Sequence, residues 1–213
     1  MTGIAAACDS GLVIELGRRL RVDVGTAEAG RLARYAGLVS AWNARIDLTA
    51  AREPAAIVEV LCADAMMLTA EALVPRGAHV VDVGSGAGAP GLALVLLRAD
   101  VTATLVEPLR KRVVFLRTAI GDLDLAARVR VVEARVDERA PKVVGGPFDV
   151  ALSRATFPAP QWIPMGLALA PRAIAFTAAG PAPSPPPGAR VDAHVDYALP
   201  SNGAPRALTR YVR

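Results

Sequence analysis

Residues 80–91 read Val80-Val81-Asp82-Val83-Gly84-Ser85-Gly86-Ala87-Gly88-Ala89-Pro90-Gly91, a pattern that indicates one fold class. The β-branched run predicts a strand, the alternate glycines predict a tight loop, and the apolar run 92–97 predicts a helix. The first turn of a helix carries N–H groups without intrahelical partners, and glycines let a ligand approach them closely. Strand, loop and helix together predict a nucleotide-type cofactor site in an α/β sheet.

Two acidic residues near this loop favour S-adenosylmethionine as the cofactor. Loops that bind dinucleotides usually read G-x-G-x-x-G, whereas this loop reads D-x-G-x-G-x-G from Asp82. A carboxylate at Asp82 repels a pyrophosphate but accepts, directly or through water, from the ammonium group of an amino acid. The next predicted strand, 102–106, ends at Glu107, 19 residues beyond Gly88, where an acidic residue typically accepts from ribose hydroxyls.

We therefore predict a cofactor site that includes both carboxylates and the three glycines. These residues are Asp82, Gly84, Gly86, Gly88 and Glu107. The alternatives are a nicotinamide-dependent oxidoreductase, which the loop spacing disfavours, and a glycine turn with only a structural role.

Length, composition and charge limit the classes of protein to which this chain can belong. The chain has 213 residues, 53% hydrophobic, and a net charge of +4, which suit one α/β domain with a small extension and hint at an anionic partner. Its two cysteines and two histidines are isolated in sequence, so we predict no metal site. The N-terminus has no signal-peptide pattern and no run of about 20 apolar residues exists, so we expect a cytoplasmic protein with no membrane contact.

The sequence pattern of the first 75 residues predicts helices, and that of the remaining residues predicts a sheet with helices between its strands. Asp9 or Ser10 is expected to cap a helix through Arg19, Thr26 to cap a second, and Pro54 to begin a third that runs to about Leu73. In the second helix, apolar side chains recur at three- and four-residue steps and predict a core-facing stripe. That stripe consists of Leu32, Tyr35, Leu38 and Trp42.

From His79 onward, short β runs alternate with helices, which predicts a mostly parallel sheet. The expected strands are 79–83, 102–106, 129–133, 148–152, 172–177, 190–196 and 206–212, and the expected helices are 89–98, 109–120 and 159–168. The last two strands are separated by a turn with Asn202-Gly203, which predicts a hairpin with one antiparallel strand. We therefore divide the chain into an N-terminal helical extension, 1–75, and a cofactor-binding domain, 76–213.

Four motifs, in order, resemble the RsmG family, also called GidB. Residues 82–91 are similar to its DVGSGAGLPG signature, and 106–116 resemble its VEPLxxKxxFL. Ser153-Arg154-Ala155 matches its SRA, and residues 42–50 resemble its WNxxxNLTA. The closing segment, 199–213, also resembles the end of the family.

The resemblance implies the activity and its partners. The family methylates guanine N7 in the decoding region of 16S ribosomal RNA, with S-adenosylmethionine as the methyl donor. Its fold is a Rossmann-like, class I methyltransferase: a mostly parallel seven-stranded sheet with a C-terminal antiparallel hairpin and an N-terminal helical extension. We accordingly expect a cytoplasmic, monomeric, RNA-binding enzyme that acts on 16S rRNA or the small ribosomal subunit.

The resemblance also implies site residues, carried over by motif. Gly84 and Ala89 would contact the cofactor, Glu107 would hold its ribose, and Val136-Asp137 would flank its adenine. Arg154 would lie beside the cofactor or the target nucleotide, as the expected catalytic residue. The alternative for Arg154 is a purely structural ion pair.

A base-free reaction fits what the sequence contains. A ring nitrogen with a free lone pair needs only to be positioned in line with an activated methyl group. A basic surface from the N-terminal helices and Arg110-Lys111-Arg112 is expected to bind phosphates. The second hypothesis is a divergent paralogue that binds the cofactor or the ribosome without this activity, or that methylates another substrate.

Overall fold

The computed structural model describes residues 7–137 and 145–213, which fold around one seven-stranded sheet. Its strand order is β3-β2-β1-β4-β5-β7-β6. The strands are β1 His79–Val83, β2 Thr102–Glu107, β3 Val129–Glu133, β4 Val150–Ser153, β5 Arg172–Thr177, β6 Arg190–Ala198 and β7 Pro205–Val212. Strands β1 to β5 pair in parallel, and β7 lies antiparallel between β5 and β6. This confirms the predicted sheet and its closing hairpin.

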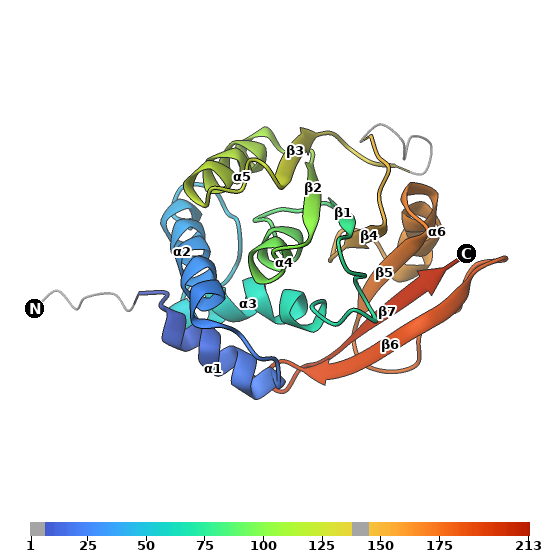
Figure 1. Cartoon of the computed structure of the whole chain (residues 1–213), viewed down its shortest axis with the longest axis horizontal. Helices are drawn as coiled ribbons and strands as arrows, with labels where there is room; N and C mark the ends of the chain where they lie inside the picture. The colour runs from blue at the N-terminus through green and yellow to red at the C-terminus, as the bar shows by residue number, and fades with distance from the viewer. Residues whose placement is uncertain (1–6, 138–144) are drawn as a thin grey trace, which may run out of the picture.

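Six helices cover the two faces of this sheet within the described residues (Figure 1). They are α1 Ser10–Leu20, α2 Thr26–Asn43, α3 Pro54–Met67, α4 Gly91–Leu97, α5 Arg110–Asp122 and α6 Ala159–Leu169. Helices α1 to α5 share one apolar cluster with alternate strand residues such as Val80 and Leu105. Helix α6 packs on the other face, against residues such as Val81 and Val106. Because strand side chains alternate between faces, Asp82 and Glu107 point to the side of α4.

The helical extension and the sheet share that first cluster. Leu32 and Tyr35 of α2, and Leu61 of α3, are buried in the same core as Leu92 and Leu94 of α4. The extension therefore packs directly against the helix that follows the glycine loop. The division between residues 75 and 76 stays a prediction.

The helix ends test the predicted caps. Asp9 accepts from the Leu12 N–H at 2.9 Å and begins α1 as predicted. Thr26 does not cap α2: the N-cap position is Gly25, with no side-chain hydrogen bond, and Thr26 lies inside the helix. The third helix ends at Met67 rather than near Leu73. The Thr69 N–H and hydroxyl both donate to the Met66 carbonyl, which closes the helix in a tight turn.

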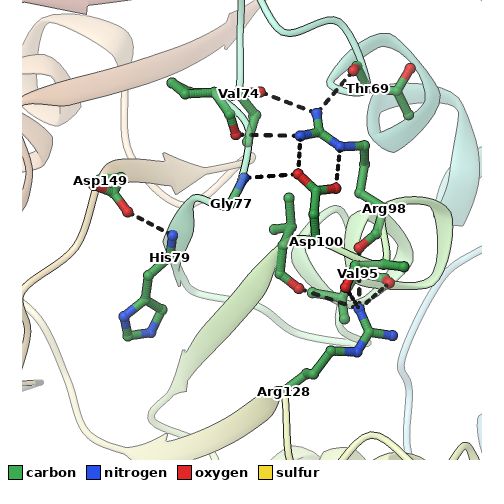
Figure 2. Close-up of polar contacts among 12 residues, drawn as sticks. Thr69, Val74, Gly77, His79, Val95, Arg98, Asp100, Arg128 and Asp149 are labelled. Atoms are coloured by element: carbon green, nitrogen blue, oxygen red, sulfur yellow. Dashed lines mark hydrogen bonds and ion pairs between the residues drawn. The ribbon is translucent and has the colours of Figure 1, made fainter.

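Two arginines fix the chain at the amino ends of the strands (Figure 2). Arg98 pairs with Asp100 at 2.6 Å and also donates to the carbonyl oxygens of Thr69, Val74 and Pro75. Arg128 donates through Nη1 to the carbonyl oxygens of Val95, Arg98, Ala99 and Val101. The Val95 carbonyl lies in the last turn of α4 and has no partner within the helix, and the other carbonyls belong to the turns that follow α3 and α4. Helix α4 is thereby anchored at the end opposite the glycine loop.

The closing hairpin turns at residues 199–204. The Leu199 N–H donates to the Ala204 carbonyl, the Gly203 N–H donates to the Leu199 carbonyl, and Gly203 has a φ of 70°. Asn202 accepts from the Ala204 N–H. The preceding proline-rich segment, 181–188, contains neither helix nor strand, as expected for residues that lack backbone donors.

Candidate active site

The glycine loop joins β1 to α4 at the carboxyl end of the sheet. Gly84, Gly86 and Gly88 have φ angles of 77°, 57° and 99°, a region that favours glycine. The N–H groups of Gly84 and Ser85 donate to the Val106 carbonyl at 2.8 and 3.1 Å. The loop is therefore folded back onto the end of the neighbouring strand, β2.

Glu107 holds the same loop with its side chain. One carboxylate oxygen accepts from the Gly86 N–H and the other from the Leu109 N–H, both at 2.9 Å. Glu107 is only 2% exposed, so these bonds form away from bulk water. A carboxylate oxygen has two lone pairs, which leaves each oxygen able to accept from a ribose hydroxyl.

Asp82 lies buried beneath the loop. Its Oδ2 accepts from the Gly91 N–H at 3.0 Å, at the first turn of α4. Its Oδ1 has no hydrogen-bond partner among the described residues. Burial raises the pKa of Asp82 to about 6, the nearby Glu107 carboxylate adds to this rise, and the Gly91 N–H and Arg154 oppose it. A buried carboxylate oxygen without a partner is suited to a cationic donor.

Asp82 should make the stability of the free protein fall with rising pH. Its folded pKa lies above its ordinary value of 3.8, so the native state binds the proton more tightly than the unfolded state. Between about pH 4 and pH 6 this group should lower the free energy of unfolding by up to about 3 kcal/mol, with no further change above. Asp82→Asn removes this titration.

Urea unfolding of both proteins across this range measures the difference between wild type and Asp82→Asn. The wild type should lose stability relative to the variant from pH 4 to pH 6. Parallel stability curves would contradict the raised pKa.

Two clefts flank the loop. The first, called here the arginine cleft, has a volume of about 240 Å³. It is lined by Leu48, Thr49, Val60, Leu61, residues 84–87, Ala89, Arg112 and residues 154–156. The second, called here the apolar cleft, has a volume of about 230 Å³ and is lined by Val83, Gly84, Pro108, residues 134–137, Thr156 and Phe157.

Gly84 and Thr156 belong to both clefts. A Cβ added at Gly84 would clash with the Thr156 side chain, so any other residue would narrow the passage where the clefts meet. A long ligand lying across Gly84 would reach both clefts at once. Gly84 is therefore the position at which the loop and the end of β4 face each other.

Arg154, just after β4, connects the arginine cleft to two other elements. Its Nη1 donates to Asp64 Oδ2 and to the Val60 carbonyl, each at 2.7 Å. The other oxygen of Asp64 accepts from the Tyr197 hydroxyl of β6. The ion pair that was the structural alternative for Arg154 thus exists, and the same side chain also lines the cleft.

The predicted site residues fall into three places. Gly84, Gly86, Ala89 and Arg154 line the arginine cleft, whereas Val136 and Asp137 line the apolar cleft. Asp82 lies beneath the loop, and Glu107 ties the loop to β2. Gly88 faces the core instead: an added Cβ would meet Leu116, Leu92 and Tyr35, each at 3.1 Å.

Sequence reasoning assigned no role to three residues that shape the arginine cleft. Asp64 is the single charged residue between Leu61 and Met67 of a buried helix, a signal of a buried ion pair. Asn43 accepts from the N–H groups of Leu48 and Thr49 and donates to the carbonyls of Thr49 and Ala51. It thereby folds the cleft-lining segment, which explains the asparagine of the 42–50 motif. Thr156 gave no signal in the sequence.

The strand order, the glycine loop and the acidic residue that ends β2 define a Rossmann-like methyltransferase. A family model described as GidB, rRNA small subunit methyltransferase G, matches residues 28–171. Ribosomal RNA small subunit methyltransferase G from Anaeromyxobacter dehalogenans is 34% identical over 208 residues, covering 91% of this chain and 93% of that protein. The chain belongs to the GidB family.

Solved structures share the fold. TrmN from Thermus thermophilus aligns with a TM-score of 0.52 at 20% identity, covering 70% of this chain and 48% of that one. A SAM-dependent methyltransferase from Aquifex aeolicus aligns with a TM-score of 0.51 at 17% identity, covering 73% and 92% of the two chains. These likenesses support the methyltransferase fold.

The enzyme is an S-adenosylmethionine-dependent methyltransferase, and the site fits that cofactor. The unpartnered Asp82 Oδ1 and the two clefts that meet at Gly84 are suited to it. Within residues 7–137 and 145–213, no cluster of histidine, cysteine or acidic side chains could hold a metal ion. None of the helices described for this chain is long and apolar enough to cross a membrane.

Proposed function

We propose that this enzyme methylates guanine N7 in the decoding region of 16S ribosomal RNA. The observation that carries the proposal is the composition of the arginine cleft. Its described lining contains two arginines but no aspartate, glutamate, histidine or lysine. Attack by a ring nitrogen lone pair on a sulfonium methyl forms a C–N bond, breaks the C–S bond and moves no proton. Such a cleft therefore suits N7, which needs positioning but no general base.

Each site residue is proposed to contact a different part of the methyl donor. We propose that Asp82 accepts from its ammonium group and that Glu107 accepts from its ribose hydroxyls. The backbone of Gly84, Gly86 and Ala89 would lie along it, and Val136 and Asp137 would flank its adenine in the apolar cleft. Gly88 would contribute by allowing the loop to pack on the core. Arg154 would face the donor or the target nucleotide from the end of β4.

Basic side chains around the arginine cleft suit an RNA partner. Arg112 lines the cleft and donates to the Asp47 carbonyl at 3.3 Å. Arg52 donates to the carbonyl of Thr49, another lining residue. Arg45, Arg110 and Lys111 are exposed in the adjoining segments. Phosphate contacts by such residues would make binding weaken steeply with salt.

Methyl transfer to defined RNA tests the proposal. The purified chain is incubated with isotope-labelled S-adenosylmethionine and either naked 16S rRNA or small subunits from a strain that lacks this modification. Nuclease digestion and mass mapping then locate the label. We expect one N7-methylguanine in the decoding region in at least one substrate, with a rate that falls between 50 and 200 mM salt. Absence of label from both substrates would overturn the proposal.

Complementation of a deletion strain distinguishes the proposed enzyme from a divergent paralogue that only binds the ribosome. If the chain restores the methylated guanine to a deletion strain, it is an enzyme for this site; a pure binder restores nothing.

We also propose that the enzyme works in the cytoplasm as a monomer. Sedimentation should then give a mass near 22.1 kDa, and twice that mass would contradict the monomer.

A further inference from the structure

We propose that Tyr35 of α2 is a positioning residue for the cofactor loop, because its hydroxyl holds the Ala87 carbonyl in the orientation that binding requires. This inference rests on the proposed binding of S-adenosylmethionine at that loop. It gives the helical extension a part in cofactor binding, beside its proposed contacts with RNA.

The contact is short and buried. The Tyr35 hydroxyl donates to the Ala87 carbonyl at 2.7 Å, across 52 residues of sequence. Tyr35 is fully buried, and Ala87 is 8% exposed although it lines the arginine cleft. Burial also raises the pKa of the Tyr35 hydroxyl well above its ordinary value, so the hydroxyl remains a donor at any working pH.

The hydroxyl lies directly under the turn of the loop. A Cβ added to Gly88 would come within 3.1 Å of the Tyr35 oxygen. The Ala87–Gly88 peptide therefore rests on the phenol, and a glycine is needed for this close approach.

The other loop anchors come from different elements. Strand β2 holds Gly84, Ser85 and Gly86 through Val106 and Glu107. On the far side of the turn, Asp82 holds Gly91. Between these anchors, the Gly88 N–H donates to the Ser85 carbonyl, whereas the Ala87 carbonyl accepts from Tyr35. Loss of the hydroxyl therefore removes the bond that ties the Ala87 carbonyl to the helical extension.

Packing alone does not explain the hydroxyl. Tyr35 belongs to an apolar stripe in which phenylalanine would fill the same space apart from one oxygen atom. Tyr35→Phe therefore keeps the ring in the core and leaves a buried carbonyl without its donor. Leaving a buried acceptor without its donor is unfavourable, and this loss falls on the segment that must be ordered when the cofactor is bound.

Tyr211 offers a matched control. It is also fully buried, and its hydroxyl donates to the Pro183 carbonyl at 2.7 Å. It lies on β7, between β5 and β6, outside both clefts as described. Tyr211→Phe thus deletes the same kind of bond at a distance from the loop.

Calorimetric titration of the full chain with S-adenosylhomocysteine tests the inference. We expect the Kd of Tyr35→Phe to rise about three- to tenfold and the Kd of Tyr211→Phe to match wild type, with similar shifts in melting temperature. In native-state hydrogen exchange, the amides of residues 86–88 should exchange faster in Tyr35→Phe while those of β5 and β7 are unchanged. In turnover assays, the KM for S-adenosylmethionine should rise while the KM for RNA stays constant.

The outcomes separate this inference from the proposed function. If wild type binds S-adenosylhomocysteine and Tyr35→Phe binds it equally well, the positioning role is wrong while the proposed function stands. Equal weakening by Tyr35→Phe and Tyr211→Phe also overturns it, because the effect would then reflect general stability. If wild type binds no cofactor, the proposed function fails and this inference fails with it.

Discussion

Replacing Glu107 with alanine should weaken the binding of S-adenosylmethionine by about 100-fold, equivalent to about 2.7 kcal/mol. The carboxylate accepts from the N–H groups of Gly86 and Leu109, and the proposed ribose contact would add to these bonds. Hydrogen bonds to a charged acceptor contribute about 1.5–3 kcal/mol each. Alanine therefore removes a direct cofactor contact and also releases the loop. Isothermal titration of the free protein with the cofactor measures the loss.

Glu133 provides the control for this variant. It ends β3 opposite Glu107 in the sheet register, and it is exposed. Glu133→Ala removes the same charge from the same edge of the sheet without touching the loop, so the Kd should stay at the wild-type value. A Kd for Glu107→Ala within threefold of wild type would contradict the role assigned to this residue.

Arg154→Met should lower the methyl-transfer rate by about 100-fold and destabilise the protein by about 3 kcal/mol. The loss of stability follows from the ion pair, because Asp64 is 9% exposed and would keep a buried charge without a cation. The loss of rate follows from the place of Arg154 in the arginine cleft. Chemical unfolding and single-turnover methylation measure the two effects separately.

A double variant separates folding from catalysis. In Arg154→Met/Asp64→Asn the buried charge is neutralised, while the asparagine oxygen can still accept from the Tyr197 hydroxyl, as Asp64 does. We expect this protein to regain most of the lost stability and to stay inactive. Recovery of methylation together with stability would show that Arg154 acts only through the ion pair.

The sheet could be predicted from the sequence because each strand and turn is marked by residues that are neighbours along the chain. The β-branched run 79–83 became β1 with the same bounds, and the Asn202-Gly203 turn closes the last hairpin. The spacing from the glycines to Glu107 placed that side chain at the loop. In each case the partners lie on adjacent strands, where register follows from the strand ends.

Contacts between distant segments could not be read from the sequence. Arg154 and Asp64 are 90 residues apart, and Tyr35 and Ala87 are 52 apart. An amphipathic stripe predicted that Tyr35 is buried but not that its hydroxyl has a partner. The early end of α3 depends in part on Arg98, whose guanidinium donates to the carbonyl oxygens of the turn that follows the helix. Such pairings are set by tertiary packing rather than by propensity.

Because the helical extension and the sheet share one core, mutations in either part should inactivate the enzyme. Random mutagenesis scored by loss of the modified nucleotide should yield inactivating substitutions along the buried side of α2 as well as in the glycine loop. Truncation libraries that start near residue 76 should yield insoluble products, because the apolar surface of α4 would lose its cover.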